Sequence, residues 1–456
     1  MANISDYLGL SAVENVNKAI ALAKANEEFN ALLSLCEERA IDRAEKVDSG
    51  EISGRLAGVP FIAKDNFLTF GSTTTAASHF LESFHAPIQA TAIEKLEAEG
   101  AICIGKSNLD AFAHGGSTEN SAFGPTLNAT DKTRVAGGSS GGSAVVTALN
   151  IVPFAIGTDT GGSIRQPASF NGVIGVKPTY GTVSRYGVVA MASSTDTIGC
   201  FTTNAADAEM VMEIMAGRDE RDMTTLPDFF APLESIKKLK IGVIKEFMTE
   251  DVDSDVISQV SGYIDNLKTA GHVIEEVSIP MLKYALAMYY IIVPAEISSN
   301  LARYDGIRYG NRVEANTLSD VYGRSRDQGF VAENKRRIMI GSYVLSSGFF
   351  DAYYLQAQKA RTLLINEFNE LHSSYDILIG PVSPTPAFKL GQNTSDPVKM
   401  YLADIMTVPA SLAGLPAISV PAGKTSDGLP VGVQLIGKRR DDAKLLALAK
   451  SMEVVA

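Results

Sequence analysis

The sequence predicts an α/β fold, in which a β-sheet carries helices on its faces. Residues 56–66 (LAGVPFIAKDN) and 101–108 (AICIGKSN) are short apolar runs bounded by turn residues, as buried strands are. Residues 90–100 between them have the apolar spacing of a helix, and this strand–helix–strand order is typical of a sheet covered by helices. The 456 residues are 45% hydrophobic and 20% charged, which fits a globular enzyme and excludes a disordered chain.

The remaining elements follow from the same patterns along the chain. Further helices are predicted at 13–25, at 30–47, after residue 143, at 253–271 and through most of 284–371. Further strands are predicted within 151–164, 171–181, 187–194, 236–247, 272–280, 375–383 and 416–421. Residues 218–236 are polar and contain two prolines, so they are predicted to form a linker or a long surface loop.

Composition narrows the class of protein and its location. No apolar run reaches the roughly 18 residues that span a bilayer, and the N-terminal MANISDYLGLSAVENV lacks the pattern of a secretory signal. Three scattered cysteines are too few for a disulfide framework or a zinc site, so we expect a cytoplasmic protein with no membrane contact and no metal site. The net charge of −12 makes direct binding of nucleic acid unfavourable, and any such role is expected to pass through a partner.

A glycine-rich stretch at 136–146, AGGSSGGSAVV, admits three interpretations. A phosphate-binding loop would end in Gly-Lys-Ser/Thr, and this stretch has no lysine. A nucleophile elbow would use Ser140 in GxSxG, but only His272 and His372 follow it, and neither has a catalytic setting. A flexible linker is the third interpretation.

A second glycine-rich cluster, GTDTGGSIR at 157–165, favours a shared site over a linker. Successive backbone N–H groups in such turns can bind an anion, including the oxyanion of an acyl-transfer reaction. Because histidine is scarce, the candidate base is Lys64, which ends the apolar run GVPFIA and would have a lowered pKa if it were buried. The alternative is a lysine at a strand end that reaches solvent, which is the commoner arrangement.

Together Lys64, GGSSGGS at 137–143 and GTDTGGSIRQP at 157–167 resemble the amidase signature family. The resemblance implies a mixed β-sheet core sandwiched by helices and a Ser–cis-Ser–Lys triad. Ser163 is then the nucleophile, Ser139 the bridging serine on a cis peptide bond, and Lys64 the base. The oxyanion hole would consist of backbone N–H groups of Thr160, Gly161, Gly162 and Ser163, and we expect Asp159 and Arg165 to brace this loop as an ion pair.

Within the family, the chain is most similar to the glutamine-hydrolysing members of tRNA-dependent amidotransferases, from about residue 10 to residue 440. Stretches such as SRYGVVAMASS (184–194) and MYLADIMTVPASLAGLPAISVP (400–421) carry this likeness. It implies that glutamine is hydrolysed to glutamate and ammonia, which passes to a B-type subunit that uses ATP and Mg²⁺ on glutamyl-tRNA. A C-type subunit would complete a heterotrimer, tRNA would be contacted only indirectly, and this chain would hold no cofactor.

The resemblance also implies a domain plan and substrate contacts. The whole chain, 1–456, would be one amidase domain, with N-terminal helices at 1–55, a signature core at about 56–200 and a helical stretch at about 284–371. Arg337 would bind the α-carboxylate of glutamine and Asp404 its α-ammonium, with a hydroxyl from Tyr290 or its neighbour Tyr289.

Other interpretations remain open for these residues. Arg337 adjoins Lys335 and Arg336, so it could belong to a solvated helix face. A stand-alone amidase acting on small amides would share the triad, and a binding or scaffold role would require the triad to be vestigial. Two departures from the family pattern, His114 in place of methionine and Ala136 in place of proline, lie outside the triad.

Overall fold

One large mixed sheet organises the computed structural model, which describes residues 2–227, 229–394 and 396–453. Its eleven strands occur in the order β1-β3-β2-β4-β6-β5-β10-β11-β9-β7-β8. The strands are β1 (Leu32–Leu35), β2 (Pro60–Lys64), β3 (Ile102–Ser107), β4 (Phe154–Asp159), β5 (Ile174–Lys177), β6 (Thr197–Thr202), β7 (Lys240–Ile244), β8 (Val273–Val277), β9 (Ile377–Pro381), β10 (Ala417–Lys424) and β11 (Pro430–Gly437). The predicted α/β class with helices around a mixed sheet is confirmed.

The parallel part of the sheet positions the site. Strand β2 lies between β3 and β4 and is parallel to both. Lys64 ends β2 and Asp159 ends β4, so both side chains lie at the same carboxyl edge. Ligands of α/β sheets bind at such edges.

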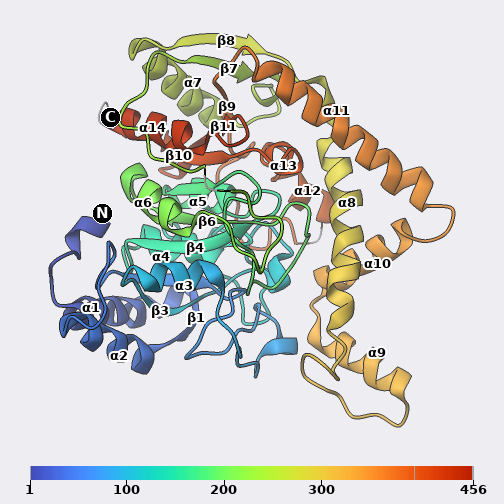
Figure 1. Ribbon diagram of the computed structural model, residues 1–456. Helices are drawn as coiled ribbons and strands as arrows, with labels where there is room; N and C mark the ends of the chain where they lie inside the picture. The colour runs from blue at the N-terminus through green and yellow to red at the C-terminus, as the bar shows by residue number, and fades with distance from the viewer. Residues whose placement is uncertain (1, 228, 395, 454–456) are drawn as a thin grey trace.

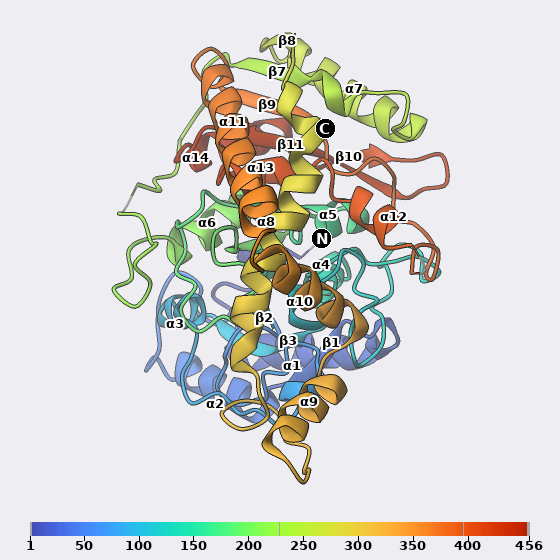
Figure 2. The same cartoon turned by 90° about the vertical axis from the view of Figure 1, so that its right-hand side faces the viewer.

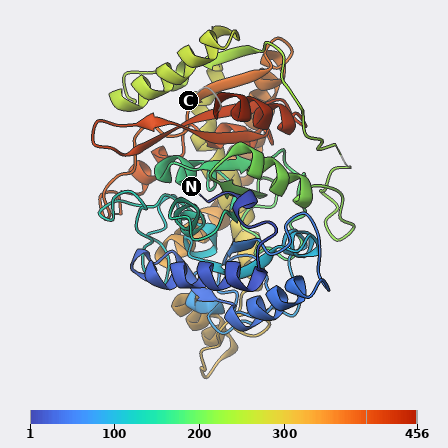
Figure 3. The ribbon, with the colours of Figure 1, turned by 90° about the vertical axis from the view of Figure 1, so that its left-hand side faces the viewer.

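Helices cover both sides of the sheet. They are α1 (Ala12–Ala25), α2 (Glu37–Asp48), α3 (Thr91–Ala98), α4 (Gly141–Ala148), α5 (Arg165–Asn171), α6 (Ala205–Met215), α7 (Ser254–Thr269), α8 (Ala285–Asn300), α9 (Leu318–Gly329), α10 (Ala332–Val344), α11 (Leu355–Leu371), α12 (Pro397–Leu402), α13 (Val408–Leu412) and α14 (Asp442–Glu453). In Figure 1, α8, α10 and α11 flank the right-hand side of the sheet, and Figure 2 shows them along the face turned to the viewer. Figure 3 shows the opposite side, where the blue N-terminal helices and the green α6 and α7 lie in front.

The central strands are buried along their whole length. Every residue of β2, β3, β4, β9 and β11 is buried, which explains why these segments have continuous apolar runs rather than alternating patterns. One helical stretch, Pro280–Arg303, has the length and composition of a membrane span, but half of its apolar 18-residue window is buried within the protein. Helix α8, which forms most of this stretch, packs against α10 and α11.

Most predicted elements are present, with three differences. The segment 30–47 begins as strand β1 and becomes helical only from Glu37, because Leu32–Leu35 pairs antiparallel with β3 at the sheet edge. The strand predicted at 187–194 is wrong: this segment is irregular and contributes one isolated bridge, between Val188 and Phe67. The sequence patterns missed the strands β6 and β11 and the helices α5, α6, α12, α13 and α14.

Candidate active site

The amine of Lys64 lies at the centre of a cluster of hydroxyl groups. Its Nζ atom is 2.8 Å from Ser139 Oγ, 2.8 Å from Ser140 Oγ and 2.9 Å from Thr158 Oγ1. Lys64, Ser139 and Ser140 are all completely buried. The apolar run before Lys64 therefore carries its side chain into the core, and the solvent-reaching alternative is wrong.

Burial lowers the pKa of Lys64 to about 7, because the charged form loses its hydration. The carboxylates of Asp110, Asp159 and Asp196 act in the opposite direction, since each favours the ammonium form. At neutral pH a substantial fraction of such a lysine is a neutral amine that can accept a proton.

The hydrogen bonds distinguish between the two neighbouring serines. The Ser140 hydroxyl donates to the Thr158 carbonyl at 3.1 Å, so its own proton is engaged and its oxygen accepts from Lys64. The Thr158 hydroxyl accepts from Asn66 Nδ2 at 3.1 Å. Within the part of the chain that the structure describes, the Ser139 hydroxyl contacts only the Lys64 amine, so Ser139 can give its proton to that amine.

A backbone hydrogen bond connects the two serine loops. The Ser140 N–H donates to the Ser163 carbonyl at 3.1 Å, and the Gly138–Ser139 peptide bond is cis, as the family resemblance implied. Ser163 is 7% exposed, and its hydroxyl has no hydrogen-bond partner among residues 2–227, 229–394 and 396–453. It is therefore free to meet a substrate.

The loop before Ser163 presents backbone donors. Among the described residues, the N–H groups of Gly161, Gly162 and Ser163 form no hydrogen bond, so they are available to an oxyanion. Gly162 has φ +145°, and a Cβ atom there would collide with Thr407. Only glycine fits this position.

Asp159 and Arg165 form the expected ion pair. Arg165 Nη2 lies 2.8 Å from Asp159 Oδ1, and Arg165 Nε lies 3.0 Å from Asp159 Oδ2. Arg165 also donates to Gln434 and to the Thr407 carbonyl, and the ion pair is completely buried. The pair thus fixes both ends of the nucleophile loop, since Asp159 precedes it and Arg165 follows it.

Arg337 is buried and its guanidinium is only partly engaged. Its Nε donates to Glu333 Oε1 at 2.7 Å, whereas its two terminal nitrogens have no hydrogen-bond partner among the described residues. The guanidinium lies over the rings of Tyr290 and Tyr401, whose centroids are 5.4 and 5.7 Å away. Arg337 also lines a cavity of about 60 Å³. The solvated-face interpretation of Arg337 is therefore wrong.

Asp404 reaches the same region from the segment after α12. A Cβ atom placed on Gly116 would lie 3.4 Å from Asp404 Oδ2, and the neighbours Gly115 and Ser117 line the cavity that Arg337 also lines. Burial raises the pKa of Asp404 to about 8, with Arg337 opposing this shift. Among the residues that the structure describes, no donor is bonded to this carboxylate.

The ring centroids of the two neighbouring tyrosines lie 5.1 Å apart, but the two residues contact different groups of the site. Tyr290 stacks on Tyr401, with ring centroids 3.8 Å apart, next to Arg337. The hydroxyl of Tyr289 approaches the nucleophile loop, since a Cβ atom on Gly161 would lie 2.6 Å from it. Tyr289 therefore lies nearer the reacting loop than Tyr290 does.

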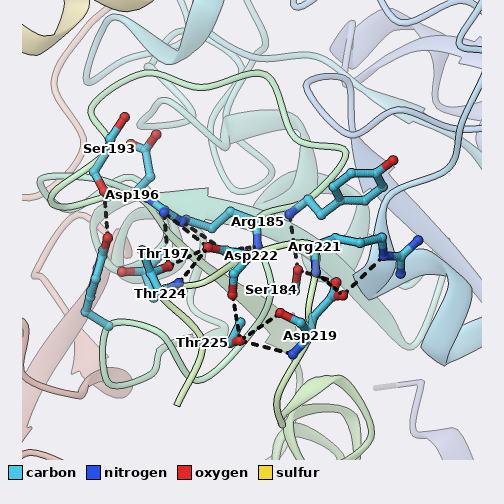
Figure 4. Close-up of polar contacts among 12 residues, drawn as sticks. Ser184, Arg185, Ser193, Asp196, Thr197, Asp219, Arg221, Asp222, Thr224 and Thr225 are labelled. Carbon is cyan, nitrogen blue, oxygen red and sulfur yellow. Dashed lines mark hydrogen bonds and ion pairs between the residues drawn. The ribbon is translucent and has the colours of Figure 1, made fainter.

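A further cavity of about 190 Å³ adjoins the lysine cluster, because Asn66 and Thr158 line it. Asp196, Arg185 and Asp222 line it as well, and the charged groups of Arg185 and Asp222 are 3.2 Å apart. Figure 4 shows Asp196, Arg185 and Asp222 as one polar cluster.

The histidines have structural contacts. His272 Nδ1 accepts from the Leu239 N–H, and His372 Nδ1 lies 3.4 Å from the Tyr375 carbonyl. His114 Nδ1 lies 2.8 Å from Asn334 Nδ2, which connects the Gly115–Ser117 segment to the helix of Arg337. No group of three or more His, Cys, Asp or Glu side chains within the described ranges is arranged to hold a metal ion.

Sequence analysis missed several residues around the site. Glu333 lies four residues before Arg337, a spacing that signals an ion pair on a helix, and Thr158 lies within the glycine-rich GTDTGGS segment. The sequence around Asp196 and around Asn66 has no motif that would indicate a place in the site.

Comparison with known proteins shows which family of proteins this chain resembles. The family model described as Amidase matches residues 14–446. The A subunit of the glutamyl-tRNA(Gln) amidotransferase from Koribacter versatilis is 51% identical over 436 residues, covering 93% of this chain and 91% of the relative. The protein of the same name from Latilactobacillus sakei is 50% identical over 453 residues, covering 97% of this chain and 93% of the relative.

A solved structure is similar as well. The crystal structure of the A subunit of the glutamyl-tRNA(Gln) amidotransferase from Thermotoga maritima matches with a TM-score of 0.83 and 41% identity, covering 99% of this chain and 94% of that one. The family match and these relatives define an amidase-type hydrolase. The chain belongs to the amidase family.

Proposed function

We propose that this chain is the glutaminase subunit of a tRNA-dependent amidotransferase, which hydrolyses glutamine to supply ammonia for converting Glu-tRNA(Gln) to Gln-tRNA(Gln). The observation that carries the proposal is that Arg337, whose terminal nitrogens are free among the described residues, and Asp404, whose carboxyl group has no bonded donor there, lie by the same small cavity. Free glutamine carries one carboxylate and one ammonium, so it needs one cation and one anion. The relatives named as A subunits of glutamyl-tRNA(Gln) amidotransferases support this assignment.

In the proposed reaction, the neutral Lys64 amine takes the Ser139 proton while Ser139 takes the Ser163 proton. Ser163 Oγ attacks the carboxamide carbon, and the resulting oxyanion is held by the N–H groups of the Thr160–Ser163 loop. The proton returns through Ser139 to the leaving nitrogen, which departs as ammonia and leaves a glutamyl ester on Ser163. Water then attacks the ester by the same proton relay, releasing glutamate and restoring Ser163.

The proposal includes the assembly. B-type and C-type subunits would complete a heterotrimer in the cytoplasm, and ATP and Mg²⁺ would act at the B-type subunit. With a net charge of −12, this chain would contact tRNA only through its partners. We further propose that residues 1–456 form one amidase domain, an inference supported by the single sheet and by the family match over 14–446.

The test is glutamine hydrolysis by the purified chain, then with B- and C-type subunits, and then with ATP and Glu-tRNA. We expect low activity from the chain alone and an increase with each addition, because the active pocket would be a minor conformation that the partners favour. Full activity of the lone chain, unchanged by any addition, would instead support a stand-alone amidase.

A further inference from the structure

Asp196 connects two parts of the site that lie far apart in sequence. Its Oδ1 atom accepts a hydrogen bond of 2.7 Å from the hydroxyl of Thr160, the first residue of the loop that ends in Ser163. The carboxylate also accepts the N–H groups of Met191 and Ala192, which hold it in place from its own segment. Thr160 is 1% exposed, so water cannot readily replace this contact.

The position of Thr160 affects the oxyanion hole, because the next residues, Gly161 to Ser163, supply its free backbone N–H groups. Oxyanion donors act only when they are held about 2.7–3.1 Å from the developing charge, so small displacements of the loop are costly. Asp159 and Arg165 fix the ends of this loop, and Asp196 fixes its first residue through a side chain.

Asp196 also lies close to the lysine cluster, because it lines the same cavity as Thr158, whose hydroxyl is 2.9 Å from Lys64 Nζ. When Lys64 accepts a proton it becomes an ammonium inside the core, and Asp110, Asp159 and Asp196 are the carboxylates that favour this form. Asp159 is paired with Arg165, and Asp110 accepts the Thr118 and Asn120 N–H groups.

Asp196 has charged and titratable neighbours besides Lys64. The Arg185 charge favours the Asp196 carboxylate, but the guanidinium itself bonds to Asp222. Tyr180 and Tyr289 also lie within electrostatic range of Asp196.

We propose that Asp196 is a positioning residue for amide hydrolysis, which anchors the oxyanion loop through Thr160 and stabilises the ammonium that Lys64 forms during the reaction. The proposal rests on the hydrolytic function proposed above. The Asp196 carboxylate thus has two effects that can be measured separately. Anchoring of the loop is measured by kcat, and stabilisation of the ammonium is measured by the pH at which kcat rises.

The experiment compares Asp196→Asn, Thr160→Val and Thr160→Ser in the assembled complex, with glutamine as substrate from pH 6 to 9. Thr160→Val removes the hydroxyl but keeps the charge, so we expect kcat to fall about ten- to hundredfold, less than the about 10²–10³-fold cost of removing an oxyanion donor. The midpoint of the rise of kcat with pH should stay unchanged. Thr160→Ser keeps the hydroxyl and should stay within about twofold of the wild type in kcat.

Asp196→Asn changes the acceptor of the Thr160 hydrogen bond and also removes the negative charge of the side chain. The ammonium form of Lys64 then loses stabilisation, its pKa falls, and the rising limb of kcat should move to lower pH by about half a unit or more. Asp222→Asn is the matched control, because it removes a carboxylate from the same cavity without contacting the oxyanion loop. It should leave both kcat and the midpoint unchanged.

Thermal unfolding of each variant separates misfolding from these effects. Equal kcat in Thr160→Val and the wild type would overturn the anchoring role, and a fall of kcat in Asp196→Asn without any shift of the midpoint would overturn the electrostatic role. If the wild type hydrolyses small amides but not glutamine, the proposed substrate fails, and the same variants on a small amide still decide the role of Asp196.

Discussion

Lys64 Nζ lies 2.8 Å from Ser139 Oγ in a part of the core where neither side chain is exposed. Because the contact is buried, the pKa of the Lys64 base is lowered chiefly by loss of hydration, against the opposing effect of the carboxylates of Asp110, Asp159 and Asp196. The same burial makes the activity depend on pH in a defined direction.

Hydrolysis should accelerate as pH rises through about 7, because the lowered pKa of Lys64 means that its neutral, proton-accepting form increases over this range. Lys64→Ala should lower kcat by at least about 10²–10⁴-fold. Lys177 is a matched control: burial also lowers its pKa to about 7, but its amine donates to the Leu415 carbonyl. The pH profile should persist in Lys177→Met, and a wild-type rate that is flat from pH 6 to 9 with chemistry limiting would contradict the role of Lys64.

Replacing each of the three serines by alanine should reduce hydrolysis to a different extent. Ser163→Ala should abolish hydrolysis, because it removes the attacking oxygen, and Ser139→Ala should impair it severely by interrupting the proton relay. Ser140→Ala should retain much more activity than Ser139→Ala, since the Ser140 proton is already donated to the Thr158 carbonyl. Measuring kcat for each variant decides the matter; an essential Ser140 with a dispensable Ser163 would favour the nucleophile-elbow hypothesis.

Arg337→Ala should raise KM for glutamine about 10- to 100-fold, because a charge-assisted contact with the substrate carboxylate is worth about 1.5–3 kcal/mol. Lys335→Ala removes a positive charge from the same helix, but Lys335 pairs with Asp327 at the surface. KM should not change in that control. Similar KM values in both variants would show that Arg337 does not bind the substrate.

Asp404 should make KM depend on pH. Its pKa is raised to about 8, so below that pH the carboxyl group is mostly protonated and cannot bind the substrate ammonium. KM should therefore rise as pH falls from 8 to 6, and Asp404→Asn should raise KM and remove this dependence. A KM that is independent of pH in the wild type would argue against the assignment.

Arg165→Ala should destabilise the fold by about 3–5 kcal/mol, because it leaves Asp159 charged and unpaired in the core. Replacing both residues together by apolar side chains should cost less, since no charge would then be left buried. Thermal unfolding midpoints of the single and double variants measure this difference. A single variant as stable as the wild type would show that the pair does not brace the nucleophile loop.

The sequence by itself determined the local features of this protein. Apolar runs and helical spacing predicted most elements, and the Lys64 and glycine-serine segments identified the family and the two loops of the site. Such features depend on neighbouring residues, which a linear pattern records. The segment 30–47 shows the limit, because its strand forms only through pairing with β3, some 70 residues further on.

Only the tertiary structure decided which buried groups pair. Lys64 and Lys106 both lie near the ends of apolar strands and are both fully buried, yet Lys106 lies 2.8 Å from Asp65 while the closest partners of Lys64 are hydroxyl groups. Burial lowers the pKa of Lys64, which has no carboxylate within hydrogen-bond distance among the described residues. The contact of Asp196 with Thr160 likewise joins residues 36 positions apart. These partners are brought together by the packing of segments that lie far apart in the sequence, so the spacing of residues along the chain does not predict them.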